Sequence, residues 1–179
     1  MLKSGEASVL TCVPYGPGVS PRVHGANAPR PSDVMRVPFR RLCAEAREPA
    51  RVHAGDAGYD LRSVEEVRLP PGGRALVRTG ISLAIPEGYA GLVLPRSGLA
   101  MRHGVAPVNT PGLIDSGYRG EILVPLINHD PREPFRIERG MRVAQLVFVR
   151  AEDVAFAEVE MLEAGTDGRG EGGFGSSGS

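Results

Sequence analysis

The sequence predicts an all-β domain built from many short strands. Its 179 residues include 16 prolines and 24 glycines, which favour turns, but only 5 phenylalanines, 4 tyrosines and no tryptophan. The core must therefore consist mainly of valine, leucine, isoleucine and alanine. Short runs of these residues between turn residues are typical of strand-rich domains. A chain of this length is expected to form one domain with a substantial core.

The expected strands are short apolar runs that end at glycine or proline. The run 141–149 is almost continuously apolar in its second half, which predicts a central, buried strand. One short helix is expected over 95–104, because Pro95 and Ser97 lie near its start and Gly104 would end it. The other expected strands cover 35–39, 59–61, 67–69, 75–77, 81–85, 89–94, 105–108, 122–128, 135–137 and 155–161.

Both ends of the chain are predicted to be flexible. Residues 1–34 are rich in proline and glycine with little apolar periodicity, so we expect a disordered extension, and Met35 is a second candidate for the start of the protein. The extension is either a partner-binding tail or a segment without a role, and its composition favours the second. The expected domain covers 35–164, and residues 165–179 form a glycine-rich arm.

Charge and cysteine content exclude several classes of protein. Lysine plus arginine and aspartate plus glutamate each number 21, so no net charge favours stable binding to nucleic acid or to a membrane surface. No apolar run is long enough to span a membrane, and the start lacks the pattern of a signal peptide. Cys12 and Cys43 form no disulfide framework, which favours a cytoplasmic setting. The histidines have no metal-ligand spacing: His24, His53, His103 and His129.

The chain is organised around the stretch 111–121, which lies between two apolar runs. Its glycines and proline predict a β-hairpin with Asp115 and Tyr118 at the tight end. A carboxylate on a rigid turn beside an aromatic ring suits a general base that faces a planar or sugar-like substrate. Alternatively, Asp115 bonds its own backbone and Tyr118 caps the core. From this stretch alone, the second interpretation is favoured.

Two further stretches carry groups that could bind an anion. Arg96 and Ser97 lie at the expected start of the helix, where free backbone N–H groups attract anions, although an ordinary capped turn would look the same. In the arm, Arg169 could pair with phosphate and Phe174 could stack on a base. Glycine-rich backbone can wrap an anion, and a flexible tail that closes over a ligand acts as a lid.

Taken together, these stretches resemble the trimeric dUTP nucleotidohydrolases (dUTPases), and the resemblance covers residues 35–179. It rests on five motifs in order: AGYDL (57–61), PRSGL (95–99), GLIDSGYRG (112–120), RGMRVAQL (139–146) and RGEGGFGS (169–176). The resemblance implies a β jelly roll that assembles as a homotrimer with exchange of the C-terminal arms. It also implies three sites between subunits, each closed by the arm of a neighbouring chain.

The implied reaction converts dUTP and water to dUMP and pyrophosphate, which limits uracil in DNA and supplies dUMP for dTMP synthesis. Asp115 matches the residue that activates the attacking water. Magnesium is expected on the triphosphate and on water, with Asp60 near a magnesium-bound water or near Arg142. The phosphate-contacting positions are Arg96, Ser97, Gly98, Gln145, Arg169 and Ser176. The uracil and deoxyribose positions are Asn109, Gly112, Leu113, Ile114, Tyr118, Phe174 and Gly175.

Two positions depart from the family pattern, because Gly117 and Met141 stand where acidic residues are common. Two other functions stay open at this point. A dCTP deaminase of the same fold would need a catalytic glutamate at the position of Pro125, and proline transfers no proton. A catalytically silent, nucleotide-binding regulator needs neither Asp115 nor an arm that carries arginine and phenylalanine. A plain jelly-roll binding module fits the five motifs least.

Overall fold

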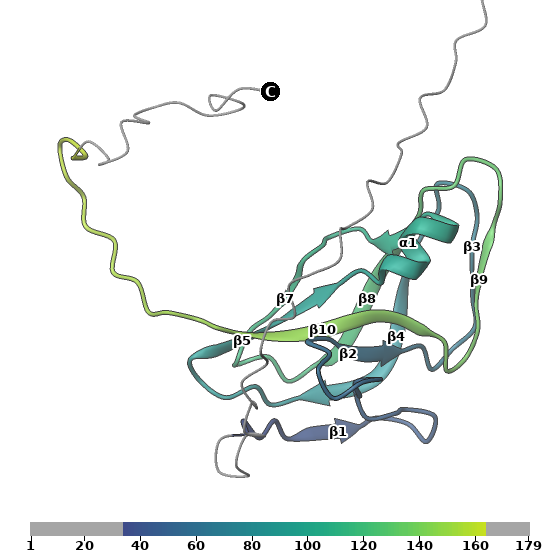
Figure 1. Ribbon diagram of the computed structural model, residues 1–179, viewed down its shortest axis with the longest axis horizontal. Helices are drawn as coiled ribbons and strands as arrows, with labels where there is room; N and C mark the ends of the chain where they lie inside the picture. Colours follow the sequence, from purple (N-terminus) through teal and green to yellow (C-terminus); the bar gives the residue numbers. More distant parts are fainter. Residues whose placement is uncertain (1–33, 164–179) are drawn as a thin grey trace, which may run out of the picture. The chain divides into compact units, whose positions relative to one another are not determined.

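The structure is a computed structural model that describes residues 34–163. Every helix and strand named below lies within Arg36–Ser179 (Figure 1). The predictions for residues 1–33 and for the arm, including its Arg169, Phe174, Gly175 and Ser176, lie outside the described residues.

Two four-stranded sheets form the body of the domain (Figure 1). The strand orders are β1-β4-β8-β6 and β2-β10-β5-β7, a separate pair joins β3 to β9, and all pairs are antiparallel. This confirms the predicted all-β class and agrees with the expected jelly roll. The elements are β1 (Phe39–Arg41), β2 (Tyr59–Arg62), β3 (Val67–Leu69), β4 (Arg74–Leu83), β5 (Tyr89–Leu94), α1 (Ser97–His103), β6 (Val105–Pro107), β7 (Gly112–Ile114), β8 (Glu121–Asn128), β9 (Phe135–Ile137) and β10 (Arg142–Arg150).

The core consists of aliphatic side chains from both sheets, as the composition predicts. Along β8 every second residue is buried, because successive side chains of a strand point to opposite faces. Ile122, Val124 and Leu126 are fully buried, and so are Val77 of β4 and Leu146 of β10. Burial of such side chains provides most of the favourable free energy of folding.

Residues 74–83 form one strand, β4, and the prediction of two strands, 75–77 and 81–85, split at Thr79-Gly80 was wrong. β4 continues through this point, but its pairing with β8 changes register between Arg78 and Ser82. Gly80 has a positive φ of 67°, and a Cβ there would come within 2.8 Å of the Cys43 Sγ atom. Thr79-Gly80 therefore marks a register shift within β4, not a turn between two strands.

The predicted tight hairpin around Asp115 was also wrong in its pairing. β6 and β8 do pair, with Pro107 opposite Leu126. The chain between them, however, contributes a strand to the other sheet, β2-β10-β5-β7. There β7 pairs with β5, and residues 115–120 then lead back to β8. A turn is present, because the Tyr118 N–H donates to the Asp115 carbonyl oxygen at 3.1 Å. Asp115 thus begins a connection between two sheets.

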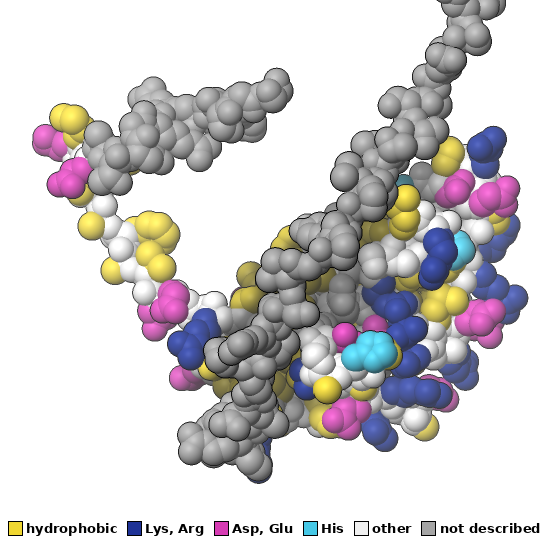
Figure 2. Space-filling model, viewed as in Figure 1, with side chains coloured by type: hydrophobic (Ala, Val, Ile, Leu, Met, Phe, Trp, Pro, Cys, Tyr) yellow, Lys and Arg dark blue, Asp and Glu magenta, His cyan; other side chains and the backbone are white. Residues whose placement is uncertain are grey.

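The strand expected at 155–161 is absent, since residues 151–163 form no strand in the described part of the chain. Apolar and acidic side chains follow one another along this segment (Figure 2), and Phe156 is 97% exposed. The first strand begins at Phe39, later than the expected 35–39.

The expected helix is confirmed as α1. Gly104 ends it in the left-handed conformation, with φ 62°, and its N–H donates to the Ala100 carbonyl. No helix within residues 34–163 is long and apolar enough to cross a membrane.

Asn128 is a fully buried polar residue that joins three segments. Its Nδ2 atom donates to the carbonyl oxygens of Leu69 at 3.2 Å and Glu133 at 2.8 Å. Its Oδ1 atom accepts from the Asp130 N–H at 3.0 Å. The end of β8 is therefore tied to β3 and to the loop before β9.

Replacing Asn128 by alanine should lower the free energy of unfolding by about 2–3 kcal/mol, because buried polar groups would lose their partners. Urea unfolding at one fixed protein concentration measures this change. The control Glu87→Ala alters an exposed turn residue and should change the free energy by less than about 0.5 kcal/mol. Equal stability of the two variants would contradict the role given to Asn128.

Candidate functional site

Six of the predicted site residues surround one cavity of about 430 Å³, called here the Asp60 cavity. They come from β2, from β10 and from the junction of β5 with α1: Asp60, Arg96, Ser97, Gly98, Arg142 and Gln145. Val52, Asp56, Ala57, Gly58, Leu94 and Val147 complete the lining. Residues separated by more than 80 positions in the sequence thus share one site.

The sheet register explains how these residues meet. Gln145 on β10 lies opposite Asp60 on β2 and opposite Leu94 on β5. Residues directly opposite one another in a sheet point to the same face. Asp60, Gln145 and Leu94 therefore form a row across three strands, and all three line the cavity.

Asp60 holds two arginines through its two carboxylate oxygens. Oδ1 lies 3.1 Å from the Arg96 Nε atom, and Oδ2 lies 3.0 Å from the Arg142 Nη1 atom. The Asp60 side chain is only 13% exposed, which limits screening by water. Charge-assisted bonds of this kind are stronger than neutral hydrogen bonds, so the carboxylate fixes both guanidinium groups.

Arg96 also donates from Nη1 to the Arg142 carbonyl oxygen at 3.1 Å. Partial burial and the neighbouring charge of Arg142 lower the pKa of Arg96, while the Asp60 carboxylate opposes this shift. Arginine stays protonated in proteins even so. Two guanidinium groups share one carboxylate here, and guanidinium donors suit an anionic ligand, although Asp56 also lines the cavity.

The position of the Gln145 side chain depends on Gly58, which was not among the predicted site residues. Its Nε2 atom donates to the Pro95 carbonyl oxygen at 2.9 Å. A Cβ atom on Gly58 would overlap the Gln145 Oε1 atom, so only glycine leaves room for this amide. The motif that contains Gly58 was recognised, but sequence spacing cannot show that Gly58 packs against Gln145.

Ser97 and Gly98 form the start of α1, as predicted. Arg96 stands at the N-cap position without a side-chain cap, and its carbonyl oxygen accepts from the N–H of Leu99 and of Ala100. A Cβ on Gly98 would come within 2.9 Å of Arg102 Nη2. Arg102 therefore brings another guanidinium group close to Gly98 of the cavity lining, and no sequence pattern indicated this contact.

The remaining described site residues lie on or beside β7: Asn109, Gly112, Leu113, Ile114, Asp115 and Tyr118. Gly112 is buried and packs against the Asn109 side chain, since a Cβ there would lie 3.4 Å from Asn109 Nδ2. Leu113 is 62% exposed, and Asp115 is exposed. None of this group lines the Asp60 cavity.

The register of β7 shows how far the residues around Asp115 lie from the Asp60 cavity. Ile114 lies opposite Gly91 on β5, so Asp115 follows at the level of Ala90. Gln145 lies opposite Leu94, four residues further along β5, which corresponds to about 13 Å along the strand. The described part of one chain therefore does not bring Asp115 to the Asp60 cavity.

Tyr118 does not cap the core, because it is 42% exposed. Its hydroxyl donates to the Glu121 carbonyl oxygen at 2.8 Å, which lays the ring along the turn that follows Asp115. The alternative interpretation of this stretch as a core cap was therefore wrong for Tyr118.

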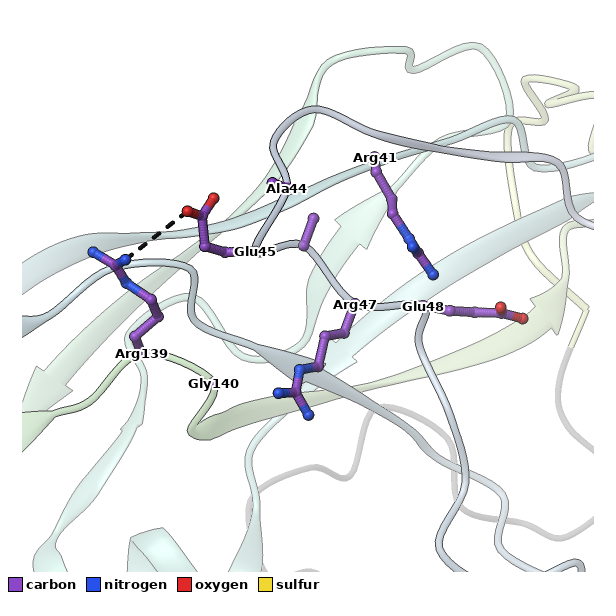
Figure 3. Close-up of a pocket in the computed structure, with 8 residues that line it drawn as sticks. Arg41, Ala44, Glu45, Arg47, Glu48, Arg139 and Gly140 are labelled. Carbon is purple, nitrogen blue, oxygen red and sulfur yellow. Dashed lines mark ion pairs between the residues drawn. The ribbon is translucent and has the colours of Figure 1, made fainter.

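A second cavity of about 620 Å³ lies between Arg41, the loop 44–48 and the turn at Arg139 and Gly140 (Figure 3). Its charged residues are of both signs, and Arg139 Nη1 lies 3.9 Å from Glu45 Oε1 with both side chains largely exposed. No predicted site residue lines this cavity, so its greater volume does not make it the candidate site.

Residues 34–163 contain no group of three or more histidine, cysteine, aspartate or glutamate side chains that could hold a metal ion. Both oxygens of Asp60 already contact arginines. Magnesium prefers oxygen ligands and keeps several waters, so Asp60 is suited to contact with a metal-bound water rather than with the ion itself.

The fold and the cavity define a jelly-roll protein whose site suits a phosphorylated ligand. The dUTPase family model matches residues 44–178. The deoxyuridine 5'-triphosphate nucleotidohydrolase of Thermobifida fusca is 55% identical over 144 residues, which cover 80% of this chain and 79% of that protein. The chain belongs to the dUTPase family.

Solved structures agree with this assignment. The Staphylococcus bacteriophage 80alpha dUTPase with dUPNHPP is 34% identical, has a TM-score of 0.75, and covers 82% of this chain and 100% of its own. A mutant dUTPase from phage phi11 of S. aureus is 30% identical with a TM-score of 0.68, over 73% of this chain and 100% of its own. That structure reveals the coordination of a structural Mg(II) ion.

Replacing Asp60 by asparagine should lower the free energy of unfolding by about 2 kcal/mol, because two partly buried guanidinium groups would lose their counter-charge. Urea unfolding at pH 7 and fixed protein concentration measures the change.

A matched control removes an exposed ion pair by Glu66→Gln. Glu66 Oε2 lies 2.6 Å from Arg136 Nη2, and this bond lowers the Glu66 pKa. Because the Glu66 pKa is lowered, the ion pair contributes to the free energy of unfolding at neutral pH and loses that contribution as pH falls. The contribution is small, because the pair is exposed to water. If both variants lose equal stability, the importance given to Asp60 is wrong.

Proposed function

We propose that this protein hydrolyses dUTP to dUMP and pyrophosphate through attack of water on the α-phosphorus. The observation that supports this most is the Asp60 cavity, where Arg96, Ser97 and Gln145 converge in a chain of the dUTPase family. In a cytoplasmic setting, this reaction would limit uracil in DNA and supply dUMP for dTMP synthesis.

The Asp60 cavity is the proposed phosphate side of the site. Negative charge builds on phosphate oxygens as the pyrophosphate leaves, so donors must already be in position. Arg96 is held by Asp60 at 3.1 Å, and Ser97 and Gly98 stand at the start of α1. We assign Gln145 to the same phosphates, and Arg142 with Asp60 to support of this arrangement. Arg169 and Ser176 of the arm are proposed as further phosphate contacts.

Asp115 is the proposed general base that activates the attacking water. A positioned base contributes roughly 10²–10⁴-fold to the rate of such a reaction. Asp115 is exposed on the turn after β7, where a substrate can reach it.

The residues around Asp115 are proposed to bind uracil and deoxyribose: Asn109, Gly112, Leu113, Ile114 and Tyr118, with Phe174 and Gly175 from the arm. An apolar pocket alone rejects an added hydroxyl only about 10²-fold. Discrimination against UTP is therefore assigned to a rigid clash between Tyr118 and a 2′-hydroxyl group. The hydrogen bond of Tyr118 to Glu121 supports that rigidity.

The complete site is proposed to form between copies of the chain in a homotrimer. Within one chain, Asp115 lies about 13 Å along the sheet from the level of Gln145. We infer that the nucleotide contacts the Asp60 cavity of one copy and the Asp115 turn of a neighbour. The domain is proposed to cover 35–164, the arm at 165–179 to close each site, and the extension before Met35 to have no part in catalysis.

Magnesium is proposed to arrive with the triphosphate, where it supplies positive charge and orients the phosphate oxygens. The chain's own part is to hold the phosphates with Arg96, Ser97 and Gln145. Asp60 is occupied by two arginines, so it would contact at most a water molecule of the metal.

Two alternatives are less well supported. A dCTP deaminase would need a proton-transferring residue at Pro125, which lies in the middle of β8 opposite Leu76. A silent nucleotide-binding regulator would not need an exposed carboxylate on an ordered turn. Neither alternative gains support from the relatives of this chain.

The reaction is tested by pyrophosphate release from dUTP, dCTP, dTTP and UTP, each with and without magnesium. We expect rapid release from dUTP with magnesium and release at least about 10²-fold slower from the other three. Ammonia release from dCTP would indicate the deaminase, and dUTP binding without release would indicate the silent regulator.

The shared site is tested by mixing two inactive variants, Asp115→Asn and Gln145→Ala. If a site takes its phosphate side and its base from different copies, trimers coexpressed in equal amounts should recover about a quarter of the wild-type activity. The double variant, which carries Asp115→Asn and Gln145→Ala in one chain and is expressed alone, is the matched control and should stay inactive. Activity of the mixture at the level of the single variants would contradict a site shared between copies.

A further inference from the structure

The turn that carries Asp115 is unusually well ordered by its own residues. The Tyr118 N–H donates to the Asp115 carbonyl oxygen at 3.1 Å. Arg119 Nη1 donates to the carbonyl oxygens of Ser116 and of Tyr118, the second at 2.8 Å. The Arg119 side chain therefore folds back over the turn and fixes the backbone on both sides of Gly117.

The Tyr118 ring closes the same turn from the other side. Its hydroxyl donates to the Glu121 carbonyl oxygen at 2.8 Å. A Cβ on Gly120 would overlap the Tyr118 hydroxyl, so glycine is required where the ring lies against the backbone. These contacts order the turn internally, but they do not attach it to the core.

Ser82 makes that attachment. It lies on β4, in the other sheet from β7, and it is 8% exposed. Its Oγ atom donates to the Arg119 carbonyl oxygen at 2.7 Å. Ser82 is also the β4 partner of Glu121, directly after the register shift.

Glu121 strengthens the same point of attachment. Its Oε1 atom accepts from the Gly80 N–H at 2.7 Å, and its Oε2 atom accepts from Arg78 Nε at 3.2 Å. The end of the turn is thus bound to the irregular part of β4 by a side chain from each strand. The irregularity in β4 places the Gly80 N–H and the Ser82 hydroxyl where they can reach the turn.

We propose that Ser82 is a positioning residue for hydrolysis: its hydrogen bond to Arg119 fixes the turn and thereby sets the direction of the Asp115 carboxylate. This inference rests on the proposed function, because it assumes that Asp115 activates water. Ser82 contacts no substrate, and its effect passes through the backbone of Arg119 and the ordered turn. The turn is exposed, so without this bond it would keep its internal contacts and the Glu121 bonds to β4, but the Arg119 carbonyl would lose its fixed position.

Thr79 provides a matched control on the same strand. Its Oγ1 atom donates to the Ile122 carbonyl oxygen at 2.6 Å, and the residue is 1% exposed. The bond resembles that of Ser82, but Ile122 belongs to β8 and lies outside the turn. Loss of the Thr79 hydroxyl should therefore affect stability without affecting the orientation of Asp115.

The experiment compares Ser82→Ala, Ser82→Thr and Thr79→Val in the full chain. Each variant is assayed for kcat and KM with dUTP, for melting temperature, and for amide exchange in peptides that cover 112–121. Ser82→Ala should lower kcat about tenfold with KM within about twofold, because a small misplacement of a reacting group acts on the transition state. Exchange in 112–121 should become faster, and Ser82→Thr should restore most of the kcat.

Thr79→Val should lower the melting temperature at least as much as Ser82→Ala and keep kcat within about twofold of the wild type. The inference is overturned if Ser82→Ala keeps the wild-type kcat, if exchange in 112–121 does not change, or if Thr79→Val loses the same kcat. Each of those results leaves an active wild-type enzyme, and so leaves the proposed function intact. A wild-type protein that does not hydrolyse dUTP would overturn the proposed function and this inference together.

Discussion

The ion pairs of Asp60 with Arg96 and Arg142 are the constraint on which the candidate site depends. They join β2, β10 and the start of α1, which are far apart in the sequence, and they hold two guanidinium groups beside an open cavity. A buried or partly buried carboxylate is costly without partners, so Asp60 and the two arginines fix one another. Both guanidinium groups are in this way fixed before any ligand binds, which is what stabilisation of a developing negative charge requires.

The sheet β2-β10-β5-β7 carries both halves of the candidate site, the Asp60 cavity and the Asp115 turn, at different positions along β5. β5 connects them, because Leu94 faces Gln145 at one level and Gly91 faces Ile114 at another. The first half is built on paired strands with partly buried ion pairs. The second half is an exposed connection, and its order comes from Arg119, Tyr118 and Ser82. Within residues 34–163 the two halves do not meet in one chain, and this supports the proposed homotrimer.

Much of this fold follows from the sequence. The aliphatic composition, the frequent turn residues and the helix boundaries at Ser97 and Gly104 predict the elements, because these signals are local. Strand partners are not local. The pairing of β7 with β5, the register shift after Arg78 and the packing of Gly58 against Gln145 depend on contacts between distant residues, and periodicity records none of them. The residues 155–161 were predicted to form a strand, but a local pattern cannot supply the partner that a strand needs. The residues of the Asp60 cavity were predicted through a family resemblance, while their ion pairs came only from the structure.

The central claim is that the phosphate side and the base side of one site come from different copies of the chain. A crystal structure of the full chain with a non-hydrolysable dUTP analogue and magnesium tests it most directly. The account predicts phosphates against Arg96, Ser97 and Gln145 of one copy, with uracil against Gly112 and Tyr118 of a neighbouring copy and a water between Asp115 and the α-phosphorus. An analogue whose base and phosphates contact a single copy, with Asp115 far from the α-phosphorus, would contradict it.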